Sequence, residues 1–282
     1  MCRIAASFSV KPSGMAAELC LAPKSLLAQA SAVKGREQKD GWGVAWYAGK
    51  AGPEVVKSPN PVYKESGLFR KTAAKAVSGT VIAHIRWASN PLGLAKSELL
   101  GKENTQPFSR GRFIFAHNGT LNIPSEIAGQ LGRYAKELRG CNDSEVLFYQ
   151  FLKMTDSCGD PGKAFEMMLE EINAAWPACR KDHPGKAAPY KGLNFFAADG
   201  ERLWLLRHFP MPKDTGALMT PRWKYGRIAY RLSPGRLVAA SEPLDNGRWD
   251  SLENLEVAEV WAGKNSVRLL KRKIRERVLN RL

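Results

Sequence analysis

Short runs of apolar residues, bounded by glycine or polar residues, dominate the first half of the chain, and this pattern is typical of buried strands. Residues 3–10 form the first run. Residues 40–47 form the second, in which two glycines lead into alternating aromatic positions. Two more runs, residues 80–89 and 112–116, end in polar residues or are followed by them. The sequence therefore predicts four strands with polar side chains at their ends.

Other stretches have the composition or spacing of helices. Residues 25–34 follow such a pattern with Ser25 as the N-cap. Residues 67–78 follow another, which Gly79 ends in the manner of a C-cap. Further helices are predicted over residues 125–138, 146–153 and 161–176. The last two follow one another along the chain, so we expect them to pack together across a sheet.

The last third of the chain is predicted to be mainly β-structure. Residues 192–198 and 202–207 flank the pair Asp199-Gly200, which is a signal for a tight hairpin turn. Residues 236–241 and 255–262 predict further strands.

The C-terminal stretch, residues 264–282, permits two structures. A turn at Lys264-Asn265 would lead into a strand over residues 267–270. A helix competes with that strand, because apolar side chains recur at helical spacing at Val267, Leu270, Ile274, Val278 and Leu282. The pattern leaves both structures open.

The composition is that of a globular protein. The 282 residues are 44% hydrophobic and 25% charged, and a chain of this length can bury a full core. No internal repeat or low-complexity linker divides it, so we expect a single domain over residues 1–282, with 264–282 as a basic extension. The sequence contains no run of 18 apolar residues, so it predicts no membrane span. Residues 1–10 also lack the apolar stretch of a signal peptide.

The five cysteines are odd in number and contain no C-x-x-C spacing. This usage favours reduced thiols in a cytoplasmic protein over a disulfide framework or a zinc site. We therefore expect a cytoplasmic protein that binds no metal.

The net charge of +16 would suit nucleic acid as a partner. However, residues 264–282 hold eight Lys or Arg and one Glu, close to half of the excess. The remaining basic residues match no RNP-like or zinc-finger pattern. A solvated basic surface is therefore favoured over nucleic-acid binding.

Candidate chemistry begins at Cys2. Cysteine is small enough for an initiator methionine to be removed in front of it, which would leave a thiol and a free α-amine on one residue. The thiolate is the reactive form, and a terminal amine with a pKa of about 7.7–8.0 can accept its proton near neutral pH. Such a nucleophile carries its own base. Alone, Met1-Cys2 is also a common chance occurrence.

Three further positions have an ordinary explanation beside a functional one. Arg86 ends an apolar strand and needs an anion, either an internal carboxylate or that of a ligand. Asn118-Gly119 is either a tight turn or the amide and backbone N–H that together make an oxyanion hole. Asp143 stands where a helix begins, and capping is the ordinary role there.

Taken together and in order, six motifs resemble the class II glutamine amidotransferases, a group of N-terminal-nucleophile hydrolases, and more narrowly their stand-alone YafJ-like branch. The motifs are Met1-Cys2, Asp40-Gly41-Trp42-Gly43, Ala83-His84-Ile85-Arg86-Trp87-Ala88-Ser89, Asn104-Thr105-Gln106-Pro107-Phe108, His117-Asn118-Gly119-Thr120-Leu121 and Asp143-Ser144-Glu145. Two later stretches, residues 192–207 and 239–244, fit this branch as well. The resemblance spans residues 2–262, and its specificity comes from the combination.

The resemblance implies an α+β fold, a four-layer αββα sandwich of two mostly antiparallel sheets between helices. It also implies an enzyme that hydrolyses the side-chain amide of glutamine. Cys2 would attack this amide, form a thioester and release ammonia, while its own α-amine moves the proton. The side-chain amide of Asn118 and the backbone N–H of Gly119 would hold the oxyanion. This chemistry needs no metal and no cofactor.

Substrate binding is implied for five other residues. The α-carboxylate of glutamine would meet Arg86, and its α-ammonium would meet Asp143. The same pocket would be lined by Trp87, Ser89 and His117.

The chain also departs from larger family members, which pass ammonia to a synthase domain that this chain has no room for. Either a separate protein accepts the ammonia or water completes an amidase reaction, and a γ-glutamyl amide could replace glutamine as the substrate. An alternative of another class is a catalytically silent module that binds glutamine or a γ-glutamyl compound and docks on a partner. A module that only binds would have no need of the nucleophile Cys2.

Overall fold

In the computed structural model, residues 2–49, 52–210 and 217–275 are described. Their strands form two sheets in which every pairing is antiparallel. The seven-stranded sheet has the order β11 (Asp250–Ser251), β9 (Ala229–Ser233), β10 (Arg236–Ala240), β1 (Arg3–Gly14), β4 (Val77–Ile85), β2 (Trp42–Tyr47) and β3 (Pro53–Ser58). The six-stranded sheet has the order β13 (Val267–Lys273), β12 (Glu256–Ala262), β8 (Arg202–Arg207), β7 (Tyr190–Ala198), β6 (Phe113–Leu121) and β5 (Phe108–Arg110).

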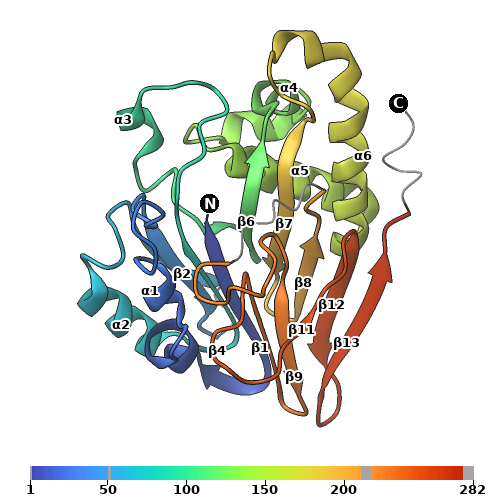
Figure 1. Cartoon of the computed structure of the whole chain (residues 1–282). Coiled ribbons are helices and arrows are strands. Elements are labelled where there is room, and N and C mark those ends of the chain that lie inside the picture. The colour runs from blue at the N-terminus through green and yellow to red at the C-terminus, as the bar shows by residue number, and fades with distance from the viewer. Residues whose placement is uncertain (1, 50–51, 211–216, 276–282) are drawn as a thin grey trace.

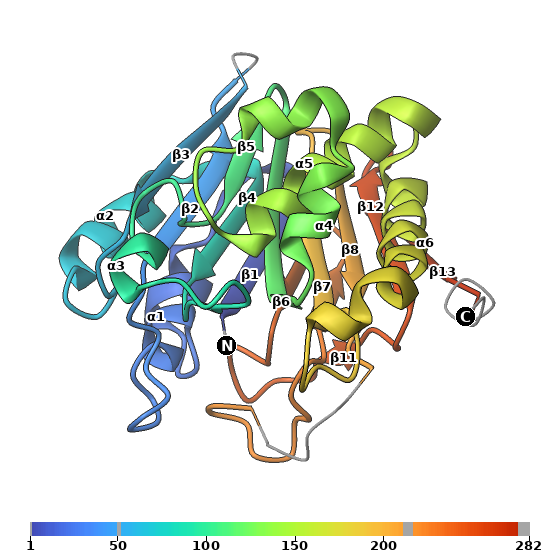
Figure 2. The same cartoon turned by 90° about the horizontal axis from the view of Figure 1, so that it is seen from above.

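Helices cover the outer faces of the stacked sheets (Figures 1 and 2). One helical layer holds a short π-helical turn (Ala17–Leu21), α1 (Leu26–Gln29) and α2 (Ser66–Lys75). The opposite layer holds α4 (Pro124–Gly129), α5 (Asp143–Cys158) and α6 (Pro161–Cys179), with 3₁₀ turns at Gly132–Glu137 and Arg180–Asp182. The short α3 (Lys96–Leu99) lies in the connection between β4 and β5.

Three apolar cores hold these four layers together. Alternation along β1 shows how one strand serves two of them: Ala5 packs under α1 and α2, whereas Ile4 and Ala6 pack between the two sheets. The third core lies between the six-stranded sheet and α4–α6, where Phe115 and Phe148 stack. This is the αββα sandwich that the resemblance implied.

The structure corrects one predicted helix end and excludes one of the two alternatives at a turn signal. Gly79 lies inside β4 and does not end a helix, because α2 ends at Lys75 and the chain pairs with β1 from Val77 onward. The pair Asn118-Gly119 likewise lies within β6 and forms no turn. In both cases pairing across the sheet overrides the local preference of glycine.

The C-terminal stretch forms a strand. Residues 267–273 pair with β12 along the whole of β13, at one edge of the six-stranded sheet. Leu270, part of the predicted helical stripe, is consequently exposed on this edge strand, whereas Ile274 is buried. Val278 and Leu282, also in the predicted stripe, lie outside the described residues.

Among the helices of the described part of the chain, none has the length and apolar character needed to cross a membrane.

Candidate active site

The predicted nucleophile lies at the end of a central strand. Cys2 directly precedes β1, and the pairing of Arg3 with Ile85 brings it alongside the residues that follow β4. Its Sγ atom lies 3.4 Å from both the backbone N and the carbonyl O of Trp87. Burial raises the pKa of the Cys2 thiol, the charge of Arg86 opposes that rise, and the charge of Asp143 adds to it. Both charged groups therefore lie within electrostatic reach of the sulfur.

Arg86 carries a buried charge that no carboxylate of the described residues neutralises. Its side chain is only 3% exposed, and its Nη1 donates to the carbonyl oxygens of Leu99 (2.7 Å) and Asp40 (3.3 Å). Within residues 2–49, 52–210 and 217–275, no Asp or Glu oxygen forms an ion pair with it. The internal salt bridge, the ordinary explanation for this arginine, is absent from the described residues. A buried cation of this kind is suited to an anionic ligand.

Asp143 is the anionic counterpart. It is the first residue of α5, but the N-cap is Asn142, whose side chain accepts from the backbone N of Ser144. The Asp143 carboxylate accepts instead from the Ser89 hydroxyl (3.0 Å) and from the backbone N of Leu121 (2.8 Å). No Lys or Arg in the described chain pairs with this buried carboxylate. The helix therefore presents Asp143 to the site without using it as its cap.

The two predicted oxyanion-hole residues lie on β6, across from β1. Asn118 is 2% exposed, and its Nδ2 lies 3.5 Å from the Oγ of Ser241. At Gly119, a Cβ atom would fall 1.7 Å from the carbonyl oxygen of Gly192 on the neighbouring strand. This close approach of two backbones excludes any side chain at Gly119.

His117, on β6, forms hydrogen bonds to the start of α5 and to β7. Its ring is buried, and its nitrogens contact the Ser144 hydroxyl (2.9 Å) and the Gly192 carbonyl (3.1 Å). Burial lowers the pKa of His117, although the nearby Asp143 carboxylate raises it. Because both nitrogens have protein partners, this geometry gives no support to a direct contact with substrate, and that role stays a prediction.

The segment between α3 and β5 makes contacts that account for two more of the motifs, residues 104–108 and 40–43. Gln106 exchanges two hydrogen bonds with the backbone of His117, and the carbonyl of Asn104 accepts from the side chain of Asn142. The segment crosses β2 so closely that a Cβ at Gly43 would lie 2.4 Å from the Gln106 carbonyl oxygen. At Gly41, where φ is +123°, a Cβ would meet Ser58 and Thr105 at 2.9 Å. These glycines let the segment hold β6 and α5 in place.

Sequence reasoning missed three buried residues at this end of the sandwich. Ser241 accepts from the backbone N of Ile4 (3.0 Å) as well as from Asn118. Glu242 forms an ion pair with Arg3 at 3.5 Å. Tyr225 lies over Arg3. The motif at residues 239–244 contains Ser241 and Glu242 and could have drawn attention to them, whereas nothing in the sequence singles out Tyr225.

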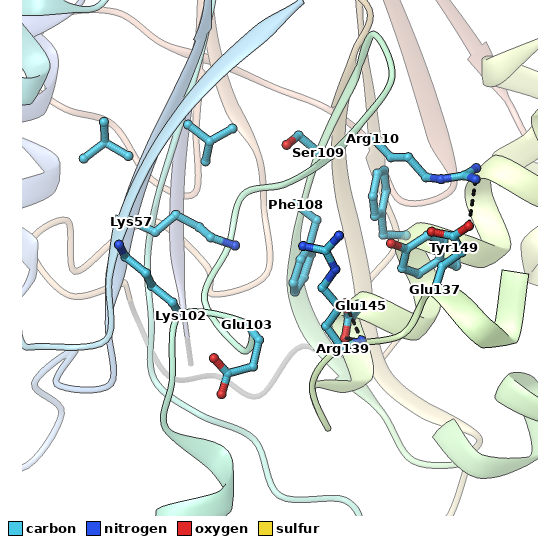
Figure 3. A pocket seen from close by; sticks show the side chains of 13 residues that line it. Lys57, Lys102, Glu103, Phe108, Ser109, Arg110, Glu137, Arg139, Glu145 and Tyr149 are labelled. Atoms are coloured by element: carbon cyan, nitrogen blue, oxygen red, sulfur yellow. Dashed lines mark hydrogen bonds and ion pairs between the residues drawn. The ribbon is translucent and has the colours of Figure 1, made fainter.

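Two pockets lie near these elements. One of about 320 Å³ is lined in part by Trp87, Asp40 and Leu99, so it adjoins Arg86. Another of about 530 Å³ is lined by β3, β5 and the start of α5, and contains none of the predicted site residues. Figure 3 shows this second pocket, with Lys57, Lys102 and Glu103 on one side and the Arg110–Glu137 ion pair on the other. Its larger volume does not make it the candidate active site, since Cys2 is not among its lining residues.

One group of side chains in the described chain could hold a metal ion. Ligand atoms of Glu126, Cys179 and His183 lie within 4.8 Å of one another. His183 Nε2 is already 2.8 Å from the Glu126 carboxylate, so the two form a hydrogen-bonded pair without a metal. The group lies in the helical layer of α4 and α6, apart from Cys2.

Comparison with known proteins agrees with this architecture. The family model "Glutamine amidotransferases class-II" matches residues 7–214, a range that begins after Cys2. The chain is 25% identical over 222 residues to the gamma-glutamyl-hercynylcysteine sulfoxide hydrolase of Mycobacterium tuberculosis, covering 78% of this chain and 75% of the relative.

Two solved structures share the fold. A glutamine aminotransferase class-II domain protein from Silicibacter pomeroyi superimposes with a TM-score of 0.62 at 19% identity, over 96% of this chain and 99% of that one. The glutamine phosphoribosylpyrophosphate amidotransferase of B. subtilis superimposes with a TM-score of 0.61 at 14% identity, over 95% of this chain and 49% of that one.

Proposed function

The chain belongs to the class II glutamine amidotransferases, and from this premise we propose that it hydrolyses the side-chain amide of glutamine, or of another γ-glutamyl amide, through a thioester on Cys2. The family and the hydrolase relative support amide hydrolysis in general. The assignment to Cys2 and to the residues around it is the finer part of the proposal.

One observation carries the proposal: two buried, opposite charges near the same sulfur lack internal partners among the described residues. Arg86 bonds only to backbone carbonyls, and Asp143 bonds only to a hydroxyl and a backbone N–H. Leaving single charges buried is costly unless a ligand completes them. The α-carboxylate and α-ammonium of an amino acid supply the two missing charges.

The reaction begins with the thiol proton. Burial raises the pKa of the Cys2 thiol, so a base must remove its proton before attack. Once Met1 is removed, the α-amine of Cys2 is that base. The thiolate attacks the amide carbon, and the negative charge that develops on its oxygen is held by Asn118 Nδ2 and the Gly119 N–H.

Collapse of this intermediate breaks the C–N bond. The α-ammonium of Cys2 returns its proton to the leaving nitrogen, which departs as ammonia or as an amine, and a thioester remains. A water molecule, deprotonated by the same α-amine, then attacks the thioester carbon. The C–S bond breaks, glutamate is released and the sulfur takes back a proton. Every step uses groups of Cys2, water and the oxyanion donors.

The leaving group sets the substrate and the partner. Release of ammonia would suit glutamine hydrolysis in water or delivery to an ammonia-accepting protein. Release of a larger amine would suit a γ-glutamyl amide, the class to which the substrate named for the M. tuberculosis relative belongs. Both share the glutamyl end, and hence the same contacts with Arg86 and Asp143.

Intact mass followed by activity measurement tests the proposal. We expect the purified protein to lack Met1 and to release ammonia from L-glutamine, or 4-nitroaniline from γ-glutamyl-4-nitroanilide. Cys2→Ala should abolish both activities while Cys20→Ala, at a buried cysteine in the outer layer, keeps them. Comparable turnover by a folded Cys2→Ala protein, or no turnover of either compound by processed wild type, would contradict the proposal.

A further inference from the structure

Three side chains of the helical layer bring a sulfur, a nitrogen and a carboxylate oxygen together. Ligand atoms of Cys179, His183 and Glu126 all lie within 4.8 Å of one another. Thiolate sulfur, imidazole nitrogen and carboxylate oxygen are the atoms that zinc binds in proteins. Bonds of about 2.0–2.3 Å to one tetrahedral zinc ion place its ligands roughly 3.3–3.8 Å apart. Small movements of these side chains therefore bring all three onto a single ion.

Two of the three ligands come from one continuous helical stretch. Cys179 is the last residue of α6, and the 3₁₀ turn Arg180–Asp182 continues the winding to His183. Residues four apart on such a stretch lie on one side, which is the spacing that pairs of zinc ligands use on helices. Glu126 comes from α4, which packs against α6 in the same layer. The third ligand thus belongs to a separate helix, so spacing along the chain does not reveal it.

The polar atoms of this group are only partly satisfied by the protein. Oε1 of Glu126 lies 2.8 Å from Nε2 of His183, whereas its Oε2 is buried and has no hydrogen-bond partner in the described chain. The Sγ of Cys179 makes only weak contacts, 3.4 Å and 3.7 Å from the carbonyl oxygens of Ala175 and Trp176. Buried polar atoms are almost always paired, so an orphaned carboxylate oxygen beside a thiol and an imidazole indicates a missing cation.

The group is sheltered by apolar side chains but can be reached from solvent. Cys179 is 8% exposed, and the side chains of His183 and Glu126 are 18% and 27% exposed. Cys179 and Trp176 belong to the apolar core of this layer, and the Trp176 ring lies 6.2 Å from that of His183 between centroids. An ion can therefore enter from the exposed side, where solvent supplies a water as a further ligand.

We propose that Cys179, His183 and Glu126 form a zinc site with water as the fourth ligand. Zinc binds the Cys179 thiolate, and the thiol proton is released to solvent. A neutral imidazole nitrogen of His183 and a carboxylate oxygen of Glu126 complete the protein ligands. The ion ties α4 to the end of α6. This site lies apart from Cys2 and is independent of the proposed function, and it departs from the absence of metal that the cysteine spacing predicted.

Cobalt(II) is the first probe, because a bound cysteine thiolate gives it a charge-transfer absorption band. A processed N-terminal cysteine, with its thiol beside an amine, would also bind metal, so the full-length Cys2→Ala protein is titrated after dialysis against EDTA. We expect one cobalt ion per chain with this band, displaced by added zinc. Adding Cys179→Ser should abolish the band. The matched control, Cys158→Ser at the partly buried cysteine that ends α5, should leave it unchanged.

Glu126→Gln tests the third ligand with less disturbance of the fold, since an amide can still form a hydrogen bond with His183. We expect its Kd for zinc to rise about 100-fold, the upper end of what loss of an outer-shell partner costs. At 100 times the parent Kd, zinc should raise Tm by about 5 °C in Cys2→Ala and by about 1 °C once Glu126→Gln is added. Isothermal titration and thermal melts measure the two effects.

Four results would overturn the site. They are a titration of Cys2→Ala without the charge-transfer band, a band that survives Cys179→Ser, a band lost in Cys158→Ser, and an unchanged zinc affinity in Glu126→Gln. None of these measurements uses glutamine or depends on turnover. The zinc site and the proposed function can therefore fail separately.

Discussion

Two buried arginines lie beside Cys2, one on β1 and one directly after the neighbouring strand β4, and their partners differ. Arg3 on β1 is 1% exposed and has an internal partner, the carboxylate of Glu242 at 3.5 Å. Arg86, just after β4, is 3% exposed and has only carbonyl oxygens as partners in the described chain. Burial alone therefore does not distinguish a structural charge from one that binds a ligand. The presence or absence of an opposite charge does.

The same contrast separates the site from the pocket of about 530 Å³ (Figure 3). There, Arg110 is paired with Glu137, and the Glu145 carboxylate accepts from the backbone N–H groups of Arg139 and Gly140. These three charged groups are satisfied by neighbouring groups of the protein. At the candidate active site, Arg86 and Asp143 have no ion-pair partner in the described chain, and this difference, not pocket volume, distinguishes the two regions.

The largest effect is expected from Arg86→Lys, which keeps the charge and removes the planar fork. We expect kcat/KM for glutamine to fall about 10²-fold, since one hydrogen bond between charged groups contributes about 1.5–3 kcal/mol. Tm should change little, because no internal ion pair is broken. Steady-state kinetics and thermal melts measure the two quantities. A large loss of Tm with unchanged kcat/KM would place Arg86 in the same structural class as Arg3.

A smaller effect is expected from Asp143→Asn, which keeps the shape and removes the charge opposite the α-ammonium. We expect a fall of about tenfold in kcat/KM for glutamine, because a neutral acceptor bonds an ammonium more weakly than a carboxylate does. Glutaramic acid, which lacks the α-amino group, should be hydrolysed equally by wild type and variant. The matched control is Asp160→Asn, at the N-cap of α6. If Asp143→Asn, like Asp160→Asn, lowers stability but leaves kcat/KM for glutamine unchanged, the Asp143 side chain has only a structural role.

The smallest effect on catalysis is expected from Glu242→Gln, which breaks the ion pair with Arg3. Removing one partner of a buried pair costs about 3–5 kcal/mol, so the free energy of unfolding should fall by that order. KM for glutamine should remain within about twofold, because Glu242 touches none of the groups that bind substrate. Urea denaturation and KM measured on the folded protein provide the readouts. A tenfold rise in KM without loss of stability would reverse the contrast between the two arginines.

Strongly patterned elements could be predicted well. Residues 42–47 of the predicted run 40–47 form β2, and Asp199-Gly200 connects β7 to β8. Ser25 caps α1, although that helix ends at Gln29 and is much shorter than the stretch its composition suggested. Such features depend on neighbours along the chain, so alternation, turn residues and caps reveal them. Helix length depends on packing, which these signals do not contain.

The candidate site was only partly predictable, for a related reason. The motifs named Cys2, Arg86, Asn118 and Asp143, but each had an ordinary local explanation. Asp143 could have been a cap, and only the structure shows that Asn142 takes that role. The side chains that support the site come from positions with weak signals or none, such as Glu242 and Tyr225.

The sequence by itself determined the chemistry that was available: a small thiol at Cys2, a fork of donors on Arg86, a carboxylate at Asp143 and an amide beside a glycine at Asn118. Tertiary structure decided which of these charges would remain without an internal partner. The register of β1 against β4 places Cys2 at Trp87, and the pairing of β6 with β7 allows only glycine at position 119. Partners of this kind lie tens to hundreds of residues apart, so their meeting follows from long-range strand pairing and packing, which local sequence patterns do not encode.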